Sequence, residues 1–346
     1  MPFSLGEALV ALAVGGSLWW LVRVLRRLRG ASGQRLALAG AAALRALAVA
    51  GVVYSAFLVL WGLNYQRPPL AVLTGLGQAT TGVATEELER LCSELVAAAN
   101  GARAAMAEDG RGVGRLDGGV RPTLSRSLEA VRGSSERYAA LHAPFAPPKR
   151  VVLSIGLSYL GLSGIFMPFT AEANVNVDLP DSQLPFTACH ELAHQGGIAP
   201  EDEANFVAYA ACVQHPHADL RYSGALNAAL YALGALAQSD PQSARRQGQW
   251  SPAVRRDLAA LTEWNERYRG PAERVSRAVN DAYLKTQGEA EGVRSYGRMV
   301  DLLILERRAS SGGARSATAR ERGVQGGTAR AIGAEVDQRP ERSPLR

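Results

Sequence analysis

The sequence predicts a mostly helical domain with a small β-sheet, preceded by two transmembrane helices. Two long apolar stretches lie within the first 65 residues, helical runs separated by Pro, Gly and Ser follow them, and two short segments have the pattern of strands. At 346 residues, the chain is long enough for two domains, or for one domain with appendages. We therefore divide it into a membrane anchor (1–65), an outer domain (66–306) and a tail (307–346).

The two apolar stretches are long enough to span a bilayer. Residues 5–22 contain one charged residue, Glu7, and would form a helix about 27 Å long. A cleaved signal peptide is disfavoured because no basic region precedes this stretch and arginines follow it. The second span is expected over residues 46–63, with Arg45 at its inner edge and Trp61 suited to the membrane interface.

Basic residues are concentrated in two segments. The chain has 38 Lys and Arg against 32 Asp and Glu, a net charge of +6. Five Arg lie between residues 23 and 35, and nine lie in the tail beside four acidic residues, so the remaining body is slightly acidic. This distribution and the 6% aromatic content argue against nucleic-acid binding. By the positive-inside rule, the Arg-rich loop is cytoplasmic and the outer domain of this multi-pass cell-membrane protein is extracytoplasmic.

The sequence predicts neither an ordered tail nor a disulfide framework. The tail is rich in Gly, Ser, Arg and Ala and has few large apolar residues, which predicts disorder. Cys92, Cys189 and Cys212 do not form a disulfide framework, and we expect them to be small buried residues. A contact between Cys189 and Cys212 is an open alternative.

The outer domain is expected to contain many helices and little sheet. Residues 151–160 are rich in β-branched side chains, and residues 173–180 alternate Val with Asn and Asp, as strands do. Two glycines, Gly196 and Gly197, would end one of the helices. Apolar residues at helical spacing predict helices over residues 85–108, 124–141, 184–195, 201–213, 224–238, 252–268 and 271–287.

The chemistry of the chain is concentrated in one short motif. His190, Glu191 and His194 form an H-E-x-x-H pattern within a predicted helix. Residues i and i+4 of a helix lie on one face, so both imidazoles can bind one Zn²⁺ ion while Glu191 projects beside them. Zinc lowers the pKa of a bound water toward about 7, and a nearby carboxylate can act as the general base on it.

The following helix offers a third ligand. Glu201 and Asn205 are four residues apart and share a face, so Glu201 can complete the site while Asn205 hydrogen-bonds to a zinc-bound histidine. Glu203 points elsewhere on the helix and is the alternative third ligand. The two glycines after His194 let the chain turn back over this short connector.

These residues resemble a known class of enzymes. H-E-x-x-H followed by Glu201-x-x-Ala204-Asn205 is similar to the gluzincin zinc metallopeptidases, in which the third ligand is a Glu four residues before an Asp or Asn on the next helix. The resemblance implies a zincin-like fold and Glu191 as the catalytic general base. The connector is shorter here than in many gluzincins, and Asn205 stands where Asp is commoner.

A closer resemblance extends over roughly residues 55–305. The runs that carry it are WGLNYQRPPL, LSYLGLSGIFMPFTAEANVN, LPFTACHELAHQGGIAPEDEANFVAYAAC and AYLKTQGEAEGVRSYGRMVDLL. They resemble an uncharacterised family of bacterial membrane proteins, a domain of unknown function with a metallopeptidase-like core. This resemblance implies a membrane anchor and an outward zinc-peptidase-like domain with no assigned substrate.

A peptidase needs further parts, for which the sequence offers candidates. Residues 173–178 are the natural edge strand for pairing with a peptide substrate. The weak candidates for stabilising an oxyanion are Arg221, Tyr222 and Tyr296. His215 and His217 follow the Glu201 helix and are expected in a loop.

The sequence therefore predicts a membrane-anchored zinc metalloendopeptidase that hydrolyses a peptide or protein substrate outside the cytoplasmic membrane, with the lipid bilayer as the partner of its anchor. The alternative is a non-catalytic, zinc-stabilised membrane module that binds an envelope peptide or protein partner. Glu191 favours catalysis, because a structural His2Glu site needs no carboxylate at that position. A metal-free packing protein is the third reading.

Overall fold

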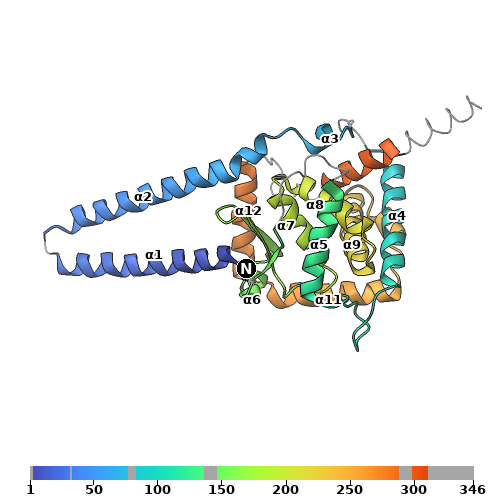
Figure 1. Ribbon diagram of the computed structural model, residues 1–346, viewed down its shortest axis with the longest axis horizontal. Coiled ribbons are helices and arrows are strands. Elements are labelled where there is room, and N and C mark those ends of the chain that lie inside the picture. Colours follow the sequence, from blue (N-terminus) through green and yellow to red (C-terminus); the bar gives the residue numbers. More distant parts are fainter. Residues whose placement is uncertain (1–2, 32, 77–82, 136–145, 288–297, 311–346) are drawn as a thin grey trace, which may run out of the picture.

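A long helical hairpin at the start of the chain projects from a domain formed by the residues that follow it (Figure 1). This computed structural model describes residues 3–31, 33–76, 83–135, 146–287 and 298–310. The described part is mostly helical and contains one three-stranded sheet, as the sequence predicts.

The hairpin consists of α1 (Leu5–Gly30) and α2 (Arg35–Leu60), which run antiparallel (Figure 1). Both helices are long and apolar enough to cross a membrane, and the apolar stretch of each lies outside the domain, not buried within it. The Arg-rich segment 23–35 lies at the hairpin tip, far from the domain. The second helix ends at Leu60, three residues before the predicted end of the span, and the short 3₁₀ helix η1 (Gly62–Gln66) follows it.

Polar contacts fasten the hairpin to the domain. The Glu7 carboxylate accepts hydrogen bonds from the backbone amides of Val152 and Leu153, at 2.9 and 2.7 Å. At the end of α2, the Trp61 indole N–H donates to the Tyr283 hydroxyl at 2.8 Å. Glu7, the single charge in the first apolar stretch, thus joins α1 to the domain.

The domain is built around α7 (Leu184–Gln195), whose residues from Leu184 to His194 are all buried. Helices α5, α8 and α9 pack against it, α4 packs on α9 at the edge away from the hairpin, and α11 and α12 lie at the periphery (Figure 1). The other described helices of the domain are α3 (Leu70–Leu73), α4 (Thr85–Arg103), α5 (Val120–Ser135), α6 (Ser154–Tyr159), α8 (Glu201–Gln214), α9 (Ala218–Ser239), α10 (Pro241–Gln247), α11 (Pro252–Tyr268) and α12 (Pro271–Thr286).

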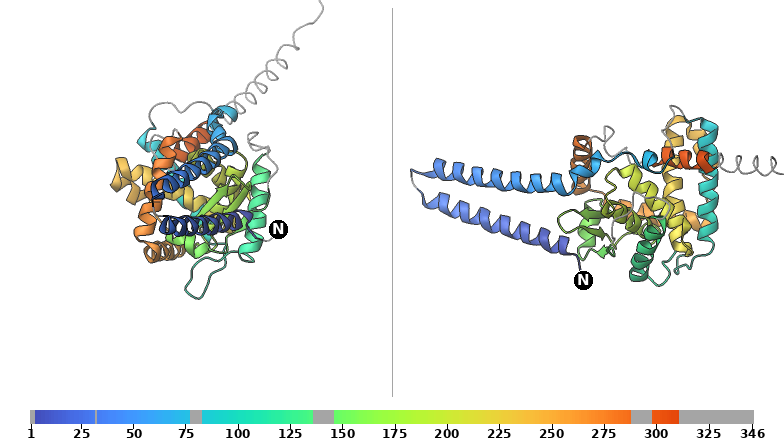
Figure 2. Two further views of the ribbon diagram at one scale, coloured as in Figure 1. Left: turned by 90° about the vertical axis from the view of Figure 1, so that its left-hand side faces the viewer. Right: turned by 45° about the horizontal axis from the view of Figure 1, so that its top comes forward.

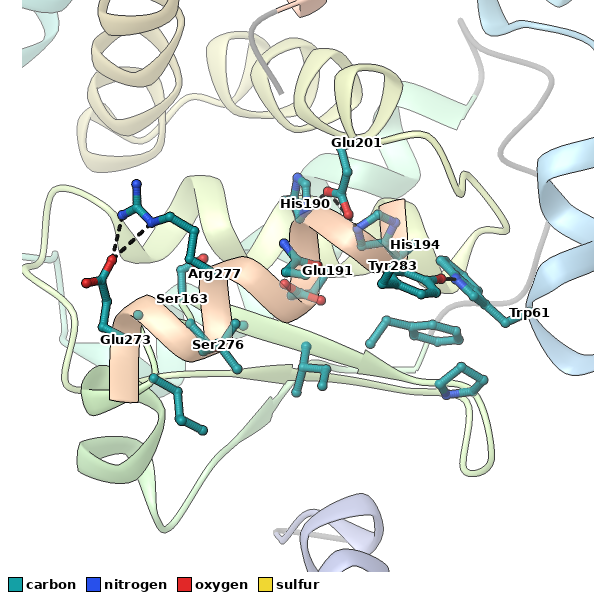
Figure 3. Close-up of a pocket in the computed structure, with 18 of the residues that line it drawn as sticks. Trp61, Ser163, His190, Glu191, His194, Glu201, Glu273, Ser276, Arg277 and Tyr283 are labelled. Carbon is teal, nitrogen blue, oxygen red and sulfur yellow. Dashed lines mark hydrogen bonds and ion pairs between the residues drawn. The ribbon is translucent and has the colours of Figure 1, made fainter. Parts of the chain in front are cut away.

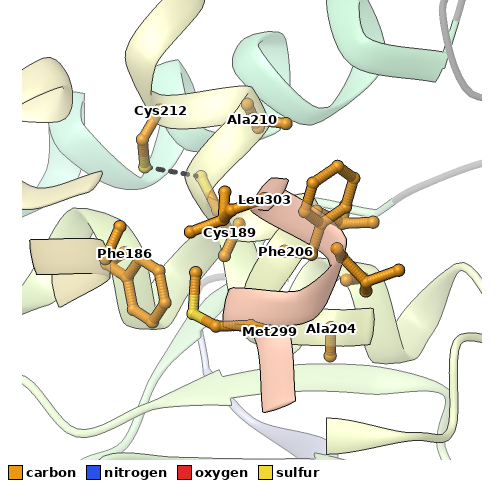
Figure 4. Close-up of a cluster of buried hydrophobic side chains, with 14 of the residues drawn as sticks. Phe186, Cys189, Ala204, Phe206, Ala210, Cys212, Met299 and Leu303 are labelled. Carbon is orange, nitrogen blue, oxygen red and sulfur yellow. Dashed lines mark hydrogen bonds between the residues drawn. The ribbon is translucent and has the colours of Figure 1, made fainter. Parts of the chain in front are cut away.

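The largest apolar core joins α4, α5, α7, α8 and α9 with the C-terminal helical segment over residues 299–310. Figure 4 shows the part of this core between α7, α8 and that segment. The cysteines are buried and free, as predicted. The Sγ atoms of Cys189 and Cys212 lie 3.6 Å apart, so these two residues touch without forming a disulfide.

The small sheet has the order β1-β3-β2, with β1 (Lys149–Arg150), β2 (Gly164–Met167) and β3 (Glu172–Val175). The central strand β3 pairs in parallel with β1 and antiparallel with β2. Residues 173–178 were therefore wrongly predicted as the edge strand, because β3 has a neighbour on both sides. The edge beside the cleft described below is β2, which the sequence patterns did not predict.

Residues 151–160 were also predicted wrongly. They form a turn and then α6 rather than a strand. The carboxylate of Glu7 binds two amides at the start of α6, and such amides lack partners within a helix. A contact between residues about 145 positions apart thus favours the helix over the local preference for strand.

The C-terminal helical segment continues to residue 310, four residues into the predicted tail. Its arginines bind α4: Arg307 pairs with Glu94 and Arg308 with Glu87, both at 2.6 Å. The remainder of the tail lies outside the described residues.

Candidate metal centre

The turn between α7 and α8 brings the two halves of the centre together. Gly197 has a φ of +82°, a left-handed conformation that favours glycine. Its amide donates to the His194 carbonyl at 2.9 Å, and the Ile198 amide donates to the Ala193 carbonyl at 3.1 Å. These two bonds form a Schellman motif, which ends α7 and reverses the chain so that Glu201 begins α8 beside the histidines.

His190, His194 and Glu201 converge on one point (Figure 3). The Oε2 atom of Glu201 lies 3.2 Å from Nε2 of His190 and 3.5 Å from Nε2 of His194. Ligand atoms about 2.05 Å from a tetrahedral zinc ion would be separated by about 3.4 Å. The three side chains therefore have the spacing of ligands on one small metal ion.

The hydrogen bond to His194 fixes which of its ring nitrogens faces Glu201. Nδ1 lies 2.7 Å from the Ile198 carbonyl oxygen, which can only accept, so the proton of a neutral ring is on Nδ1. The lone pair on Nε2 then faces the carboxylate oxygen of Glu201, which is buried and accepts no hydrogen bond from the described residues. Two acceptors that face each other in the interior need a cation between them, so these residues fit a metal ion.

The pKa values of the cluster reflect the same arrangement of charge. Burial alone would raise the pKa of Glu201, but the positive charge of the nearby histidines, His194 above all, outweighs it and holds this pKa well below its usual range. Burial would lower the pKa of His194, but the Glu201 carboxylate outweighs it and raises the pKa to about 9. Without a metal ion, a proton on the imidazole supplies the positive charge that Glu201 faces.

Glu191 lies beside the centre, against the backbone of β2 (Figure 3). A Cβ atom at Gly164 would lie 2.5 Å from its Oε1 atom, so only glycine leaves room for the carboxylate in this position. Burial raises the pKa of Glu191 to about 7, although the nearby histidines oppose the shift. Its Oε2 atom is buried and has no hydrogen-bond partner among the described residues. The side chain is thus placed as a proton acceptor close to neutral pH.

The centre lies in the wall of a cleft of about 760 Å³, within the ~300–1,000 Å³ typical of ligand sites. Aromatic side chains from the end of α2 form one wall: Trp61 packs its ring against those of His194 and Phe166, with centroid distances of 5.4 and 5.0 Å. Another wall is α12, which contributes Arg277 and Tyr283 (Figure 3). Sequence reasoning missed these walls, because no local pattern links residues 57–65 or 271–286 to the H-E-x-x-H helix.

The structure separates the two candidates for the third ligand. Glu201 joins the histidines, whereas the Oε1 atom of Glu203 accepts a hydrogen bond from the Leu70 amide at 2.6 Å and does not belong to the cluster. Asn205 is buried beneath the site and hydrogen-bonds with Tyr231. For His194, the predicted hydrogen-bonding role of Asn205 is taken by the carbonyl of the Schellman turn.

The two described oxyanion candidates do not line the cleft, which corrects that prediction. Tyr222 is fully buried in a separate apolar cluster and donates to Asp257 at 2.7 Å. The Arg221 guanidinium donates to the backbone carbonyls of His215 and Pro216. Both have local partners that fix them elsewhere. The third candidate, Tyr296, lies outside the described residues.

His215 and His217 lie at the bend between α8 and α9, as expected for a loop, and stack on each other with a centroid distance of 5.4 Å. Neither lines the cleft. His217 instead lies 3.0 Å from Asp117 on the surface.

A family model, described as a protein of unknown function (DUF3810), matches residues 1–304. The chain belongs to the DUF3810 family. In this DUF3810 chain the match includes both hairpin helices, α12 and the cluster of His190, His194 and Glu201. The predicted membership in a family of unknown function is confirmed, and the family description itself assigns no activity. No curated protein and no solved structure matches the chain.

Proposed function

We propose that this protein is a zinc-dependent metalloendopeptidase anchored in the cell membrane. The observation that carries the proposal is the placement of four side chains in one cleft: the cluster of His190, His194 and Glu201, with Glu191 beside it. A His2Glu donor set is typical of catalytic zinc, which keeps one position for water or substrate. The neighbouring carboxylate is the group that hydrolysis requires and a structural site does not.

Each residue has a stated role in this proposal. His190, His194 and Glu201 hold the ion, which when bound supplies a Lewis acid and lowers the pKa of a coordinated water. Glu191 accepts the proton of the attacking water at Oε2 and passes it to the departing amine. The exposed edge of β2 aligns the substrate by main-chain hydrogen bonds, since within the described sheet β2 pairs on one side alone.

The membrane topology of the proposal follows from charge. The hairpin tip carries five Arg between residues 23 and 35 and no acidic residue. Short loops with such an excess remain cytoplasmic, so two spans place the domain on the extracytoplasmic side. A reporter fused within residues 66–76 that is active in the cytoplasm would contradict this orientation.

The deciding experiment measures metal content and hydrolysis on the full-length protein in nanodiscs. Wild type, Glu191→Gln and the matched control Glu203→Gln are compared against a peptide library. We expect about one zinc per chain in all three proteins, and hydrolysis reduced by at least ~100-fold in Glu191→Gln alone.

Two other outcomes would contradict the proposal. Zinc bound at full stoichiometry, with no peptide in the library cleaved by wild type, would favour a zinc-stabilised module that binds an envelope partner. Wild-type protein that binds no zinc would contradict both functions and favour a packing role for the histidines.

A further inference from the structure

The cleft lies at the end of the hairpin that joins the domain. Helices α1 and α2 leave the domain on the same side (Figures 1 and 2). The last turn of α2 contributes Phe57 to the lining of the cleft, and Trp61 directly after the helix contributes the next aromatic ring. The metal centre is therefore next to the point where the apolar helices begin, and not on the far side of the domain.

The helix α12 crosses the base of the hairpin (Figure 1). One of its faces lines the cleft through Ser276, Asn280 and Tyr283. A neighbouring face carries Val275 and Val279, which are 64% and 63% exposed, and the exposed Ala278 and Ala282 complete a stripe at i, i+3, i+4 and i+7. A helix with a continuous apolar face directed away from its own domain is typical of helices that lie in a membrane interface.

A second group of exposed apolar side chains lies beside α1. Val152 and Leu153 are 71% and 68% exposed, and their amides are held by Glu7 at the start of α1. Ile155 follows on α6 and is 59% exposed. Phe169, 40% exposed, lies in the turn between β2 and β3, a turn that packs on Gly6. These contacts with Gly6 and Glu7 place this group at the domain end of the hairpin.

We propose that these side chains form one membrane face, which rests in the head-group layer of the bilayer that the hairpin spans. The membrane face consists of Val152, Leu153, Ile155, Phe169, Val275 and Val279. Soluble surfaces scatter large apolar side chains, whereas here they gather around the bases of two helices that are apolar enough to enter lipid. Because the membrane face is continuous with these two helices, we take the lipid bilayer as its partner.

Charged residues on α12 agree with this placement. Arg274 is exposed at the edge of the apolar stripe, as is Lys285, which pairs with Asp281 at 2.6 Å. The long side chain of Arg274 can reach lipid phosphates while the valines enter the interface. The cleft then opens at the level of the head groups. If the proposed peptidase function also holds, its substrates are peptide segments held close to the membrane surface.

The test measures the depth of labelled residues and does not depend on hydrolysis. Full-length Val279→Cys carries an environment-sensitive fluorophore in nanodiscs whose lipids bear a shallow nitroxide quencher. Arg274→Cys on the flank of α12 and Ser93→Cys on α4, at the far side of the domain, are the matched controls. The native cysteines are buried, and we therefore expect little labelling of them by the fluorophore. Labelling of the wild-type protein measures this background.

We expect the lipid quencher to reduce emission at Val279→Cys at least ~2-fold more than at Ser93→Cys, with Arg274→Cys between them. Val275→Cys repeats the measurement if the first variant fails to fold, and zinc content reports folding for each. Equal quenching at positions 279, 275 and 93 would overturn the proposal, whether or not the protein hydrolyses peptides.

Discussion

Gly164→Ala should displace the carboxylate of Glu191 while residue 191 remains a glutamate. The added Cβ would lie 2.5 Å from Oε1 of Glu191 and 2.7 and 2.8 Å from its Cγ and Cδ atoms. Ordinary contacts begin at about 3.4 Å, so the carboxylate must move by roughly 1 Å or the strand must yield by the same amount. A displacement of about 1 Å in a catalytic group can cost about 100-fold in rate, equivalent to about 2.7 kcal/mol.

We therefore expect Gly164→Ala to bind zinc fully and to lose about 100-fold in kcat/KM for whichever library peptide wild type cleaves. The control is Gly133→Ala on α5, where an added Cβ meets nothing within 4 Å. It should keep wild-type activity and gain up to about 1 kcal/mol in stability, because alanine favours a helix.

Two results would refute this reasoning. Wild-type kcat/KM in zinc-loaded Gly164→Ala would show that hydrolysis does not depend on where the Glu191 carboxylate lies. Loss of zinc in the same variant would show that the clash reaches the metal cluster instead of remaining at Glu191.

Three further substitutions test the centre and its surroundings. His194→Ala should lower bound zinc from about one to below ~0.1 per chain, measured by mass spectrometry of the metal. Glu201→Gln should lower the affinity for zinc at least ~100-fold in a competition with a chelator, whereas Glu203→Gln should leave this affinity unchanged. Equal losses of affinity in the two variants would indicate that Glu203 is also a ligand. Tyr222→Phe removes a donor from the buried Asp257 carboxylate and should lower the free energy of unfolding by about 1–3 kcal/mol at constant zinc content. Loss of bound zinc in Tyr222→Phe without a fall in the free energy of unfolding would contradict a purely structural role for Tyr222.

The parts of the molecule that the sequence predicted are those with local causes. The two apolar helices follow from composition, and α7 and α8 follow from helical spacing and the glycines between them. The cluster of His190, His194 and Glu201 needs only a helix, a tight turn and a second helix within twelve residues. Short-range geometry was therefore enough to identify this group.

The errors arose where distant residues decide the structure. The segment 151–160 contains α6, and the distant Glu7 binds the two amides directly before this helix; β2 forms beside a strand that packs on α7. Tyr222 was a poor candidate because Asp257, 35 residues away, fixes its hydroxyl in the core. No pattern in a single sequence reveals such pairings, since each depends on the completed fold.

The aromatic wall at the end of α2 has a practical consequence for how the protein is prepared. Trp61 packs on the ring of His194 and hydrogen-bonds to Tyr283, so the hairpin supplies a structural part of the cleft. A fragment trimmed to begin at residue 66 would leave one side of the centre open to water and α12 without its contact to the indole. The hairpin therefore belongs to the structure of the candidate metal centre, and a fragment meant to preserve this site should include it.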